Sequence, residues 1–199
     1  MGKCLFMRKG ETHSAPFHIP KGSTKLDHIE STGSQYLNLG FSPNQDTKIE
    51  IKFQTNQSSQ CGIAVADVAW QSNGFGIWGN AACYGNETVQ NLTLYGSEAI
   101  TVILDKGKLY KNGELIWEAS AATFQVPVNM TLMALNRNGT VQEKTSMKLW
   151  YFKAWDGDSL IRDCVPLMLE DGSVGEYDVV NGVFYGNAGS GTLTGSEVA

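Results

Sequence analysis

The chain has 199 residues, of which 18% are charged and 10% aromatic, and its formal net charge at pH 7 is −5. This length suits one domain with a sizeable core. The negative charge argues against a nucleic-acid partner, and the absence of an apolar run of about 18 residues argues against a membrane span. Glycine is abundant, at 22 residues, whereas proline occurs 5 times. This mixture favours an all-β domain with many tight turns.

The first residues differ in character from the rest of the chain. Residues 1–19 mix basic and polar side chains, and Pro16 and Pro20 interrupt any helix there. The apolar run over 4–7 is too short for the core of a signal peptide. We therefore predict an N-terminal attachment arm over 1–19 and one sandwich domain over 20–199. The cysteines have no zinc spacing and are expected to be free thiols: Cys4, Cys61, Cys83 and Cys164.

Alternating apolar and polar residues predict strands along most of the chain. In "TKIEIKFQT" (47–55), Ile49, Ile51 and Phe53 fall on one face and polar residues on the other. Alternation of this kind starts only near residue 36. The other predicted strands lie within 35–41, 61–70, 74–80, 88–95, 99–119, 128–136 and 145–156. In the last of these, Trp150, Phe152 and Ala154 are expected to share a face.

Turn signals separate these segments. Lys106-Gly107 and Asn112-Gly113 are typical of tight hairpins, and Asn181-Gly182 predicts a turn into "VFYG". The turn at Asn138-Gly139 is expected to join the strands over 128–136 and 145–156. Ten or more strands at this spacing, with no segment of helical period, indicate a two-sheet antiparallel β-sandwich or jelly roll.

The glycine-rich stretch "GNAGSGTLTG" (186–195) raises the question of phosphate binding. A phosphate loop requires a lysine where Thr192 stands, and it must open a helix. We predict instead that these glycines shape the backbone, bind nothing, and let the end of the chain pair with a strand near 35–40. Of Phe184 and Tyr185, which precede them, one should be buried and the other near the surface.

Two long motifs resemble a known family. "HIESTGSQYLNLGF" (28–41) and "LIRDCVPLMLEDGSVGEYDVVNGVFYGNAGSGTLTG" (160–195) are similar to motifs of the concanavalin A-like lectin/glucanase (LamG-like) sandwich of bacteriophage structural and tail proteins. The resemblance covers roughly residues 20 to 195. The matching positions are Arg162, Asp163, Pro166, Gly175, Tyr177, Asp178 and 184–191. His28 stands where the family often has tyrosine, and we expect it on an edge strand.

The resemblance implies a bacteriophage virion protein that displays a lectin-like sandwich for decoration or for adhesion to a host-surface glycan. Residues 1–19 would attach it to other virion proteins in many copies. Lacking a signal peptide, it would be made in the cytoplasm of the host bacterium and reside in the virion. A purely structural head, tail or baseplate role is the first alternative, and a glycoside hydrolase is the second.

Catalysis is not expected. Glucanases of this fold carry a close pair of glutamates on one strand, because acid and nucleophile must share a face, and no such motif occurs here. The acidic residues over 170–178 are interpreted as turn residues. No cofactor and no metal is predicted, since Asp67 and the turn over 156–158 resemble no calcium loop.

Sugar binding would use aromatic rings and amides in or near loops. The candidate residues are Trp70, Trp78, Asn80 and Tyr84. Either Ile77 or Trp78 should face outward, because they are neighbours on one strand. If Trp78 stacks on sugar, Trp78→Ala should weaken binding and leave the melting temperature nearly unchanged.

Overall fold

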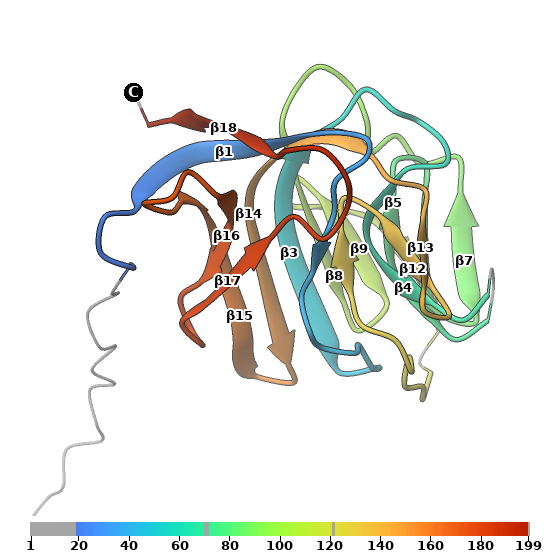
Figure 1. The fold of residues 1–199 in the computed structure, drawn as a ribbon. Helices are drawn as coiled ribbons and strands as arrows, with labels where there is room; N and C mark the ends of the chain where they lie inside the picture. Colours follow the sequence, from blue (N-terminus) through green and yellow to red (C-terminus); the bar gives the residue numbers. More distant parts are fainter. Residues whose placement is uncertain (1–18, 70–71, 121, 199) are drawn as a thin grey trace, which may run out of the picture.

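Two β-sheets pack face to face in the computed structural model, which describes residues 19–69, 72–120 and 122–198 (Figure 1). No helix occurs among the described residues, and hence none with the length and hydropathy of a membrane span. The predicted all-β, two-sheet sandwich is confirmed. All strand pairs are antiparallel except β4 with β12. Of the predicted arm, residues 1–18 lie outside the described residues.

The larger sheet has ten strands in the order β10-β9-β8-β3-β14-β1-β15-β16-β17, with β18 paired to β1. Their bounds are β1 Thr24–Thr32, β3 Thr47–Gln54, β8 Ile100–Asp105, β9 Lys108–Lys111, β10 Glu114–Glu118, β14 Ser146–Asp156, β15 Ser159–Met168, β16 Val174–Asp178, β17 Val183–Gly186 and β18 Thr194–Glu197.

The smaller sheet has eight strands. Its main path is β13-β12-β4-β5-β6-β7, and β11 joins β2 to β4. Their bounds are β2 Leu37–Asn38, β4 Gly62–Asp67, β5 Gly74–Trp78, β6 Ala81–Gly85, β7 Glu87–Gln90, β11 Thr131–Leu132, β12 Leu135–Arg137 and β13 Thr140–Gln142.

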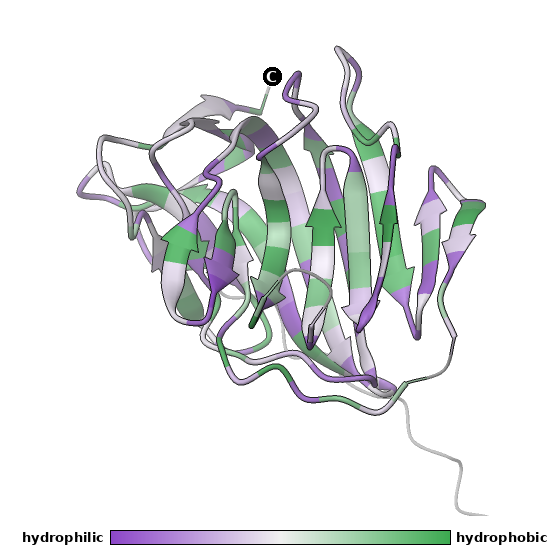
Figure 2. Cartoon of the chain, turned by 90° about the vertical axis from the view of Figure 1, so that its right-hand side faces the viewer, coloured by the Kyte–Doolittle hydropathy of each residue, from purple (hydrophilic) through white to green (hydrophobic). Residues whose placement is uncertain are grey.

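The core lies between the two sheets. On β3, Ile49, Ile51 and Phe53 are fully buried while the residues between them are half-buried, as the alternation predicts. Phe75 and Ile77 of β5 enter the same core from the smaller sheet. Figure 2 shows this pattern as green bands that recur along the strands, with purple gathering in the connections. Burial of these apolar side chains is the main force that holds the sheets together.

The predicted turns are confirmed by their backbone angles. Residues 106–107, 112–113 and 138–139 each have two successive positive φ angles, between +47° and +86°. Two positive φ angles are the signature of a type I′ turn, whose twist matches the flanking strands. The first two turns connect β8 to β9 and β9 to β10. The third connects β12 to β13, a short strand that was not predicted, and not directly to the strand over 145–156 as expected.

The expected shared face of β14 is confirmed for Phe152 and Ala154, which are both buried, but it is wrong for Trp150. The register against β3 shifts between Leu149 and Tyr151, where a β-bulge adds a residue. Leu149 and Phe152 therefore both point into the core, whereas Trp150 remains half-buried on the other face. A single extra residue moves the side chains on one side of the bulge to the opposite face, so strict alternation fails here.

The first strand also departs from expectation. β1 begins twelve residues before Tyr36, where alternation was expected to start, and His28 is not at an edge. β1 pairs with β14, β15 and β18, and His28 is 7% exposed. Its ring nitrogens lie 2.8 Å from an Asp27 oxygen and 2.9 Å from a Glu30 oxygen. These carboxylate contacts compensate for burying a polar ring.

Three predicted strands are shorter than expected. Of 35–41 only Leu37–Asn38 is a strand, and β7 ends at Gln90, before Asn91 with φ +63°. The segment 128–136 is divided into β11 and β12 by Met133, whose φ is also +63°. A positive φ takes the chain out of extended conformation, and hydropathy patterns do not reveal it.

The two ends of the described chain meet, as predicted for the glycine-rich stretch, but the last strand pairs with β1 and not with a strand near 35–40. β18 runs beside β1 (Figure 1), while Ala188 N–H donates to the Tyr36 carbonyl at 2.9 Å and Ser190 N–H to the Ser34 carbonyl at 3.2 Å. A Cβ on Gly189 would overlap the Ser34 carbonyl oxygen, and Gly191 has φ +72°. Glycine is therefore required by close approach at one position and by backbone conformation at the other.

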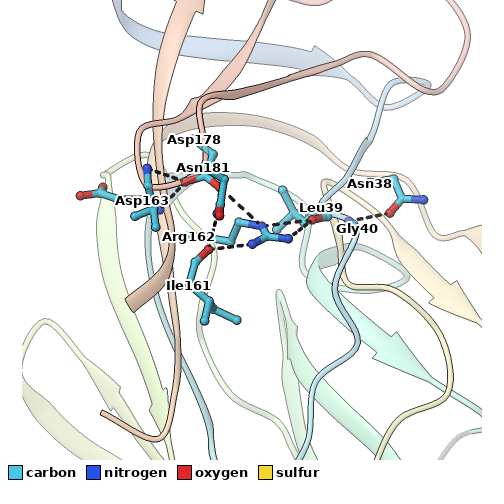
Figure 3. A network of polar contacts seen from close by, with 9 residues as sticks. Asn38, Leu39, Gly40, Ile161, Arg162, Asp163, Asp178 and Asn181 are labelled. Carbon is cyan, nitrogen blue, oxygen red and sulfur yellow. Dashed lines mark hydrogen bonds and ion pairs between the residues drawn. The ribbon is translucent and has the colours of Figure 1, made fainter. Parts of the chain in front are cut away.

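Phe184 and Tyr185 do not divide into a buried and an exposed ring, because both are half-buried on β17. Next to them lies a polar network around Arg162 (Figure 3). The Arg162 guanidinium donates to the Leu39 carbonyl at 3.2 and 3.1 Å and lies 3.6 Å from the buried Asp178 carboxylate. Asp178 also accepts from Asp163 N–H and from the Asn181 amide. We call residues 34–36 and 187–192, together with Arg162 and Asp178, the terminal closure.

Candidate functional site

A small polar pocket lies at one end of the eight-stranded sheet. It has a volume of about 290 Å³ and is lined by Ser59, Gln60, Trp78, Asn80, Ala81, Gln90 and Glu143. Three side-chain amides, one hydroxyl, one carboxylate and one indole thus converge on one space. We call it the amide pocket. It contains two of the predicted site residues, Trp78 and Asn80.

The lining residues come from three connections and from the ends of β5, β6 and β7, which the fold brings together. The β3–β4 connection supplies Ser59 and Gln60, the β5–β6 turn supplies Asn80, and residue 143 follows β13. Gly79 lets the β5–β6 turn approach the first connection, since a Cβ there would lie 2.6 Å from the Cys61 sulfur and overlap the Gln57 carbonyl oxygen. Any other residue at 79 would push Asn80 away from Gln60.

Hydrogen bonds from the backbone fix the positions of these connections. Gly79 N–H donates to the Cys61 carbonyl at 3.3 Å, and Leu92 N–H donates to the Asn80 carbonyl at 3.0 Å. Gly62 N–H donates to the Glu143 carbonyl at 2.8 Å. The pocket is therefore built on paired main chain, which lets its side chains be held for binding.

The pocket's amide groups are not used by the protein itself. Within the described residues, the side chains of Gln60, Asn80 and Gln90 make no hydrogen bond to another residue. Asn80 is half-buried, and the other two are exposed. Each amide offers two donors and one acceptor oxygen. Together they can satisfy several hydroxyl groups of a polar ligand.

Trp78 forms the floor of the pocket rather than an exposed stacking surface. It is 3% exposed and packs with Val65, Ala81, Cys83 and Leu135 in a small cluster separate from the main core. Ile77, its neighbour, is fully buried in the main core. Both are buried, so the expected outward position is wrong. A buried tryptophan costs about 3–5 kcal/mol when cut to alanine, and Trp78→Ala would not leave the melting temperature unchanged.

The indole of Trp78 has a polar role. Its Nε1–H donates to Glu143 Oε2 at 2.8 Å. Charge-assisted hydrogen bonds of this kind are short and strong. The bond fixes the carboxylate of Glu143 at the wall of the pocket, while its other oxygen has no hydrogen-bond partner among the described residues. That oxygen can accept from a ligand hydroxyl.

Tyr84 does not belong to the site. It is 3% exposed on the core face of β6, its hydroxyl donates to the Gln45 carbonyl at 2.7 Å, and its ring packs edge-on against Phe124. The ring therefore has no face for a sugar. Trp70, the remaining predicted residue, lies outside the described residues. Asp67, weighed as a calcium ligand, accepts two hydrogen bonds from Arg137 at 3.0 and 2.9 Å.

A larger groove of about 680 Å³ lies on the ten-stranded sheet, where β14 and β15 separate to admit β1. It includes Trp150, but that ring is already contacted by the His28 ring at 5.0 Å and by the Lys52 ammonium at 5.6 Å. Lys153 in the groove pairs with Asp163 at 3.1 Å. Its aromatic and charged groups are thus engaged with each other, and it lacks the three available amides of the amide pocket.

Comparisons with known proteins bear on the fold. No protein-family model and no curated protein matches the chain. Among solved structures, the chain is similar to a "putative carbohydrate binding protein" from Bacteroides ovatus, with a TM-score of 0.55 and 11% sequence identity. The match covers 87% of this chain and 61% of that one, so the chain spans less than two thirds of its neighbour's length. At this identity the likeness extends to the fold alone.

Sequence reasoning missed Gln60, Gln90 and Glu143. Each lies among other polar residues in a connection or at a strand end, and no local pattern distinguishes it from its neighbours. The backbone offers one signal, because Gln60 and Glu143 have φ angles of +50° and +48°. Sparsely populated conformations of this kind gather at functional sites, but they are visible only in the structure.

Proposed function

We propose that this protein is a carbohydrate-binding module whose sugar ligand occupies the amide pocket. The observation that carries the proposal is the convergence of three amides and a carboxylate on one small space. The amides have no hydrogen-bond partner among the described residues, and the carboxylate is fixed by Trp78. Such groups match the hydroxyl-rich surface of a sugar, because each hydroxyl both donates and accepts. The fold similarity to a protein described as carbohydrate-binding supports the same direction.

The proposed role is binding without catalysis. Glycoside hydrolysis requires two carboxyl groups about 5–9.5 Å apart on either side of the scissile bond. The lining of the amide pocket contributes one carboxylate, that of Glu143. A ligand in this pocket would meet hydrogen-bonding groups but no acid and base pair.

The biological setting is also a proposal. The end motifs resemble those of bacteriophage structural proteins, which supports a virion protein that carries the sandwich for decoration or host-glycan adhesion. Residues 1–19 would anchor it to other virion proteins, and many copies would compensate for weak single-site binding. A purely structural role is the second candidate, because the residues that carry the resemblance, such as Arg162 and Asp178, close the sandwich.

A glycan array probed with the full chain tests the sugar-binding proposal. Wild type should bind a defined set of glycans, and Asn80→Ala combined with Gln90→Ala should weaken that binding at least tenfold. Glu114→Ala is the matched control, since Glu114 is exposed on β10 of the other sheet. An array with no bound glycan, or equal binding by the pocket variant, would refute the proposal and leave the structural role.

A further inference from the structure

Glu143 is held in an uncommon backbone conformation at the wall of the amide pocket. Among the described residues, eight that are not glycine have positive φ angles. Four are asparagine, which tolerates this region, and Lys106 lies in a type I′ turn. Of the remaining three, Gln60 and Glu143 both line the pocket. A glutamate rarely adopts a positive φ, so the packing around residue 143 must hold its backbone in this conformation and thereby fix the position of its carboxylate.

The pocket has a negative charge without a positive counterpart. No lysine, arginine or histidine is among its lining residues. Lys144, the next residue in the chain, directs its ammonium group to the Tyr36 ring at 5.9 Å. Arg137 is bound to the buried Asp67 carboxylate through two hydrogen bonds, which neutralises it. Among the described residues, Glu143 therefore forms no direct ion pair, and its hydrogen-bond donor is the Trp78 N–H.

Neighbouring groups respond to this charge. Burial raises the pKa of the Cys61 thiol, and the Glu143 carboxylate raises that pKa further. The hydrogen bonds to Asp67 raise the pKa of Arg137, and Glu143 adds to that increase. Both shifts indicate that the negative potential of Glu143 extends into the protein around the pocket.

We infer that the amide pocket selects uncharged sugar units and excludes acidic ones, and that Glu143 is the residue that decides between them. The inference rests on the proposed function. A neutral sugar can donate a hydroxyl to the free oxygen of Glu143, a charge-assisted hydrogen bond. A uronate, sialate or sugar phosphate would instead bring a second negative charge next to a carboxylate in a pocket whose lining has no cation, and like charges at close range repel.

The dimensions of the pocket add to this description of the ligand. Its volume of about 290 Å³ is at the lower end of the range for small-molecule sites. One sugar ring therefore fits, and further units of a glycan would extend into solvent past Gln60 and Gln90, which are exposed at the rim. Glu143 therefore interacts electrostatically with the sugar unit inside the pocket.

Paired ligands test the inference. Isothermal titration of the full chain compares methyl glucoside with methyl glucuronoside, and methyl galactoside with methyl galacturonoside, because each pair differs only in the carboxylate. At least one neutral ligand should bind about tenfold or more tightly than its acidic partner. Glu143→Gln should weaken the neutral ligand and reduce the difference within the pair to less than about twofold. Glu114→Gln, on the other sheet, should change neither.

A measurement on wild type alone covers the case in which the Glu143 variant does not fold. Raising the salt concentration from about 0.02 to 0.5 M should narrow the difference within a pair, because salt screens the repulsion. Equal binding of both members, or tighter binding of the acid, would overturn the inference while the proposed function stands. Absence of binding for every sugar on the array and in titration would overturn both.

Discussion

The terminal closure and the amide pocket both gather polar groups from distant parts of the chain, but they use them differently. In the closure, Arg162 and Asp178 bind each other and the surrounding main chain. In the pocket, the amides of Asn80 and Gln90 face solvent with no partner among the described residues. Polar groups that satisfy one another stabilise the fold, whereas those left available can bind a ligand. The two regions should therefore respond in opposite ways to substitution.

The largest effect is expected at the centre of the closure. Asp178→Ala removes the acceptor for Asp163 N–H and the Asn181 amide, and it leaves Arg162 without its carboxylate. Breaking a buried pair from one side costs about 3–5 kcal/mol of unfolding free energy. Urea unfolding measures it, with the exposed turn residue Asp158 changed to alanine as the control. A loss below about 1 kcal/mol for Asp178→Ala would show that the network does not hold the ends together.

Next in size are the glycines of the closure, which provide an internal comparison. Gly189→Ala should cost about 2–3 kcal/mol, because its Cβ would overlap the Ser34 carbonyl oxygen, and Gly191→Ala about 1–2 kcal/mol, because of its φ of +72°. Gly186→Ala should cost less than either, since its Cβ would meet only the edge of the Phe184 ring, at 3.3 Å.

Melting temperatures of the three glycine variants, with and without ATP, check this order. Melting temperatures of all three variants equal to that of the parent protein would contradict the structural role of these glycines. A rise in the melting temperature of the parent protein with ATP would restore the phosphate-loop reading of this stretch.

An effect that depends on pH is expected from Glu176. This side chain is fully buried on β16, and neither oxygen has a hydrogen-bond partner in the described part of the chain. Burial raises its pKa well above 4.5. The folded protein therefore keeps a proton that the unfolded chain releases above about pH 4.5. Stability should fall as pH rises from there, by up to about 1.4 kcal/mol per pH unit. Glu176→Gln should remove this dependence.

Unfolding free energies of wild type and Glu176→Gln between about pH 5 and 8 measure the effect. The unfolding free energy of the variant should increase relative to that of wild type as pH rises, because all other titrating groups are common to both proteins. Parallel pH profiles would mean that Glu176 is ionised in the folded protein.

The smallest effect on stability is expected in the pocket. Asn80→Ala and Gln90→Ala remove side chains that make no hydrogen bond within the described part of the chain, so each should change the unfolding free energy by no more than about 0.5 kcal/mol. Thermal unfolding checks this value. A loss of about 2 kcal/mol or more would move these residues from a binding role to a structural one and remove the contrast with the closure.

Much of the fold could be predicted because its signals are local. The alternation around Ile51 and the turns at Asn112-Gly113 and Asn138-Gly139 depend on neighbouring residues only, and the structure has them where they were predicted. The bulge at Trp150 and the break at Met133 depend on what a strand pairs with. β1 was missed for the same reason, since its partners lie more than a hundred residues away in the chain.

The candidate site could be predicted only in part. Trp78 and Asn80 stood out as an indole and an amide beside a turn, and both line the pocket. Tyr84 has the same local features, yet it faces the core because it lies on the inner side of β6. Glu143 became part of the site only through a hydrogen bond across 65 residues of sequence. No single-sequence pattern contains such a contact.

The indole signals of the five tryptophans provide the most direct test of the central claim that the amide pocket binds sugar. In a two-dimensional nitrogen–proton spectrum, the Trp78 Nε1–H signal is assigned as the one that Trp78→Phe removes. On titration with the glycan that binds best on the array, this signal should shift, because its acceptor Glu143 also contacts the ligand, while the Trp150 and Trp155 signals stay in place. A bound glycan that leaves the Trp78 signal unchanged and shifts Trp150 would place the site on the other sheet and contradict the account.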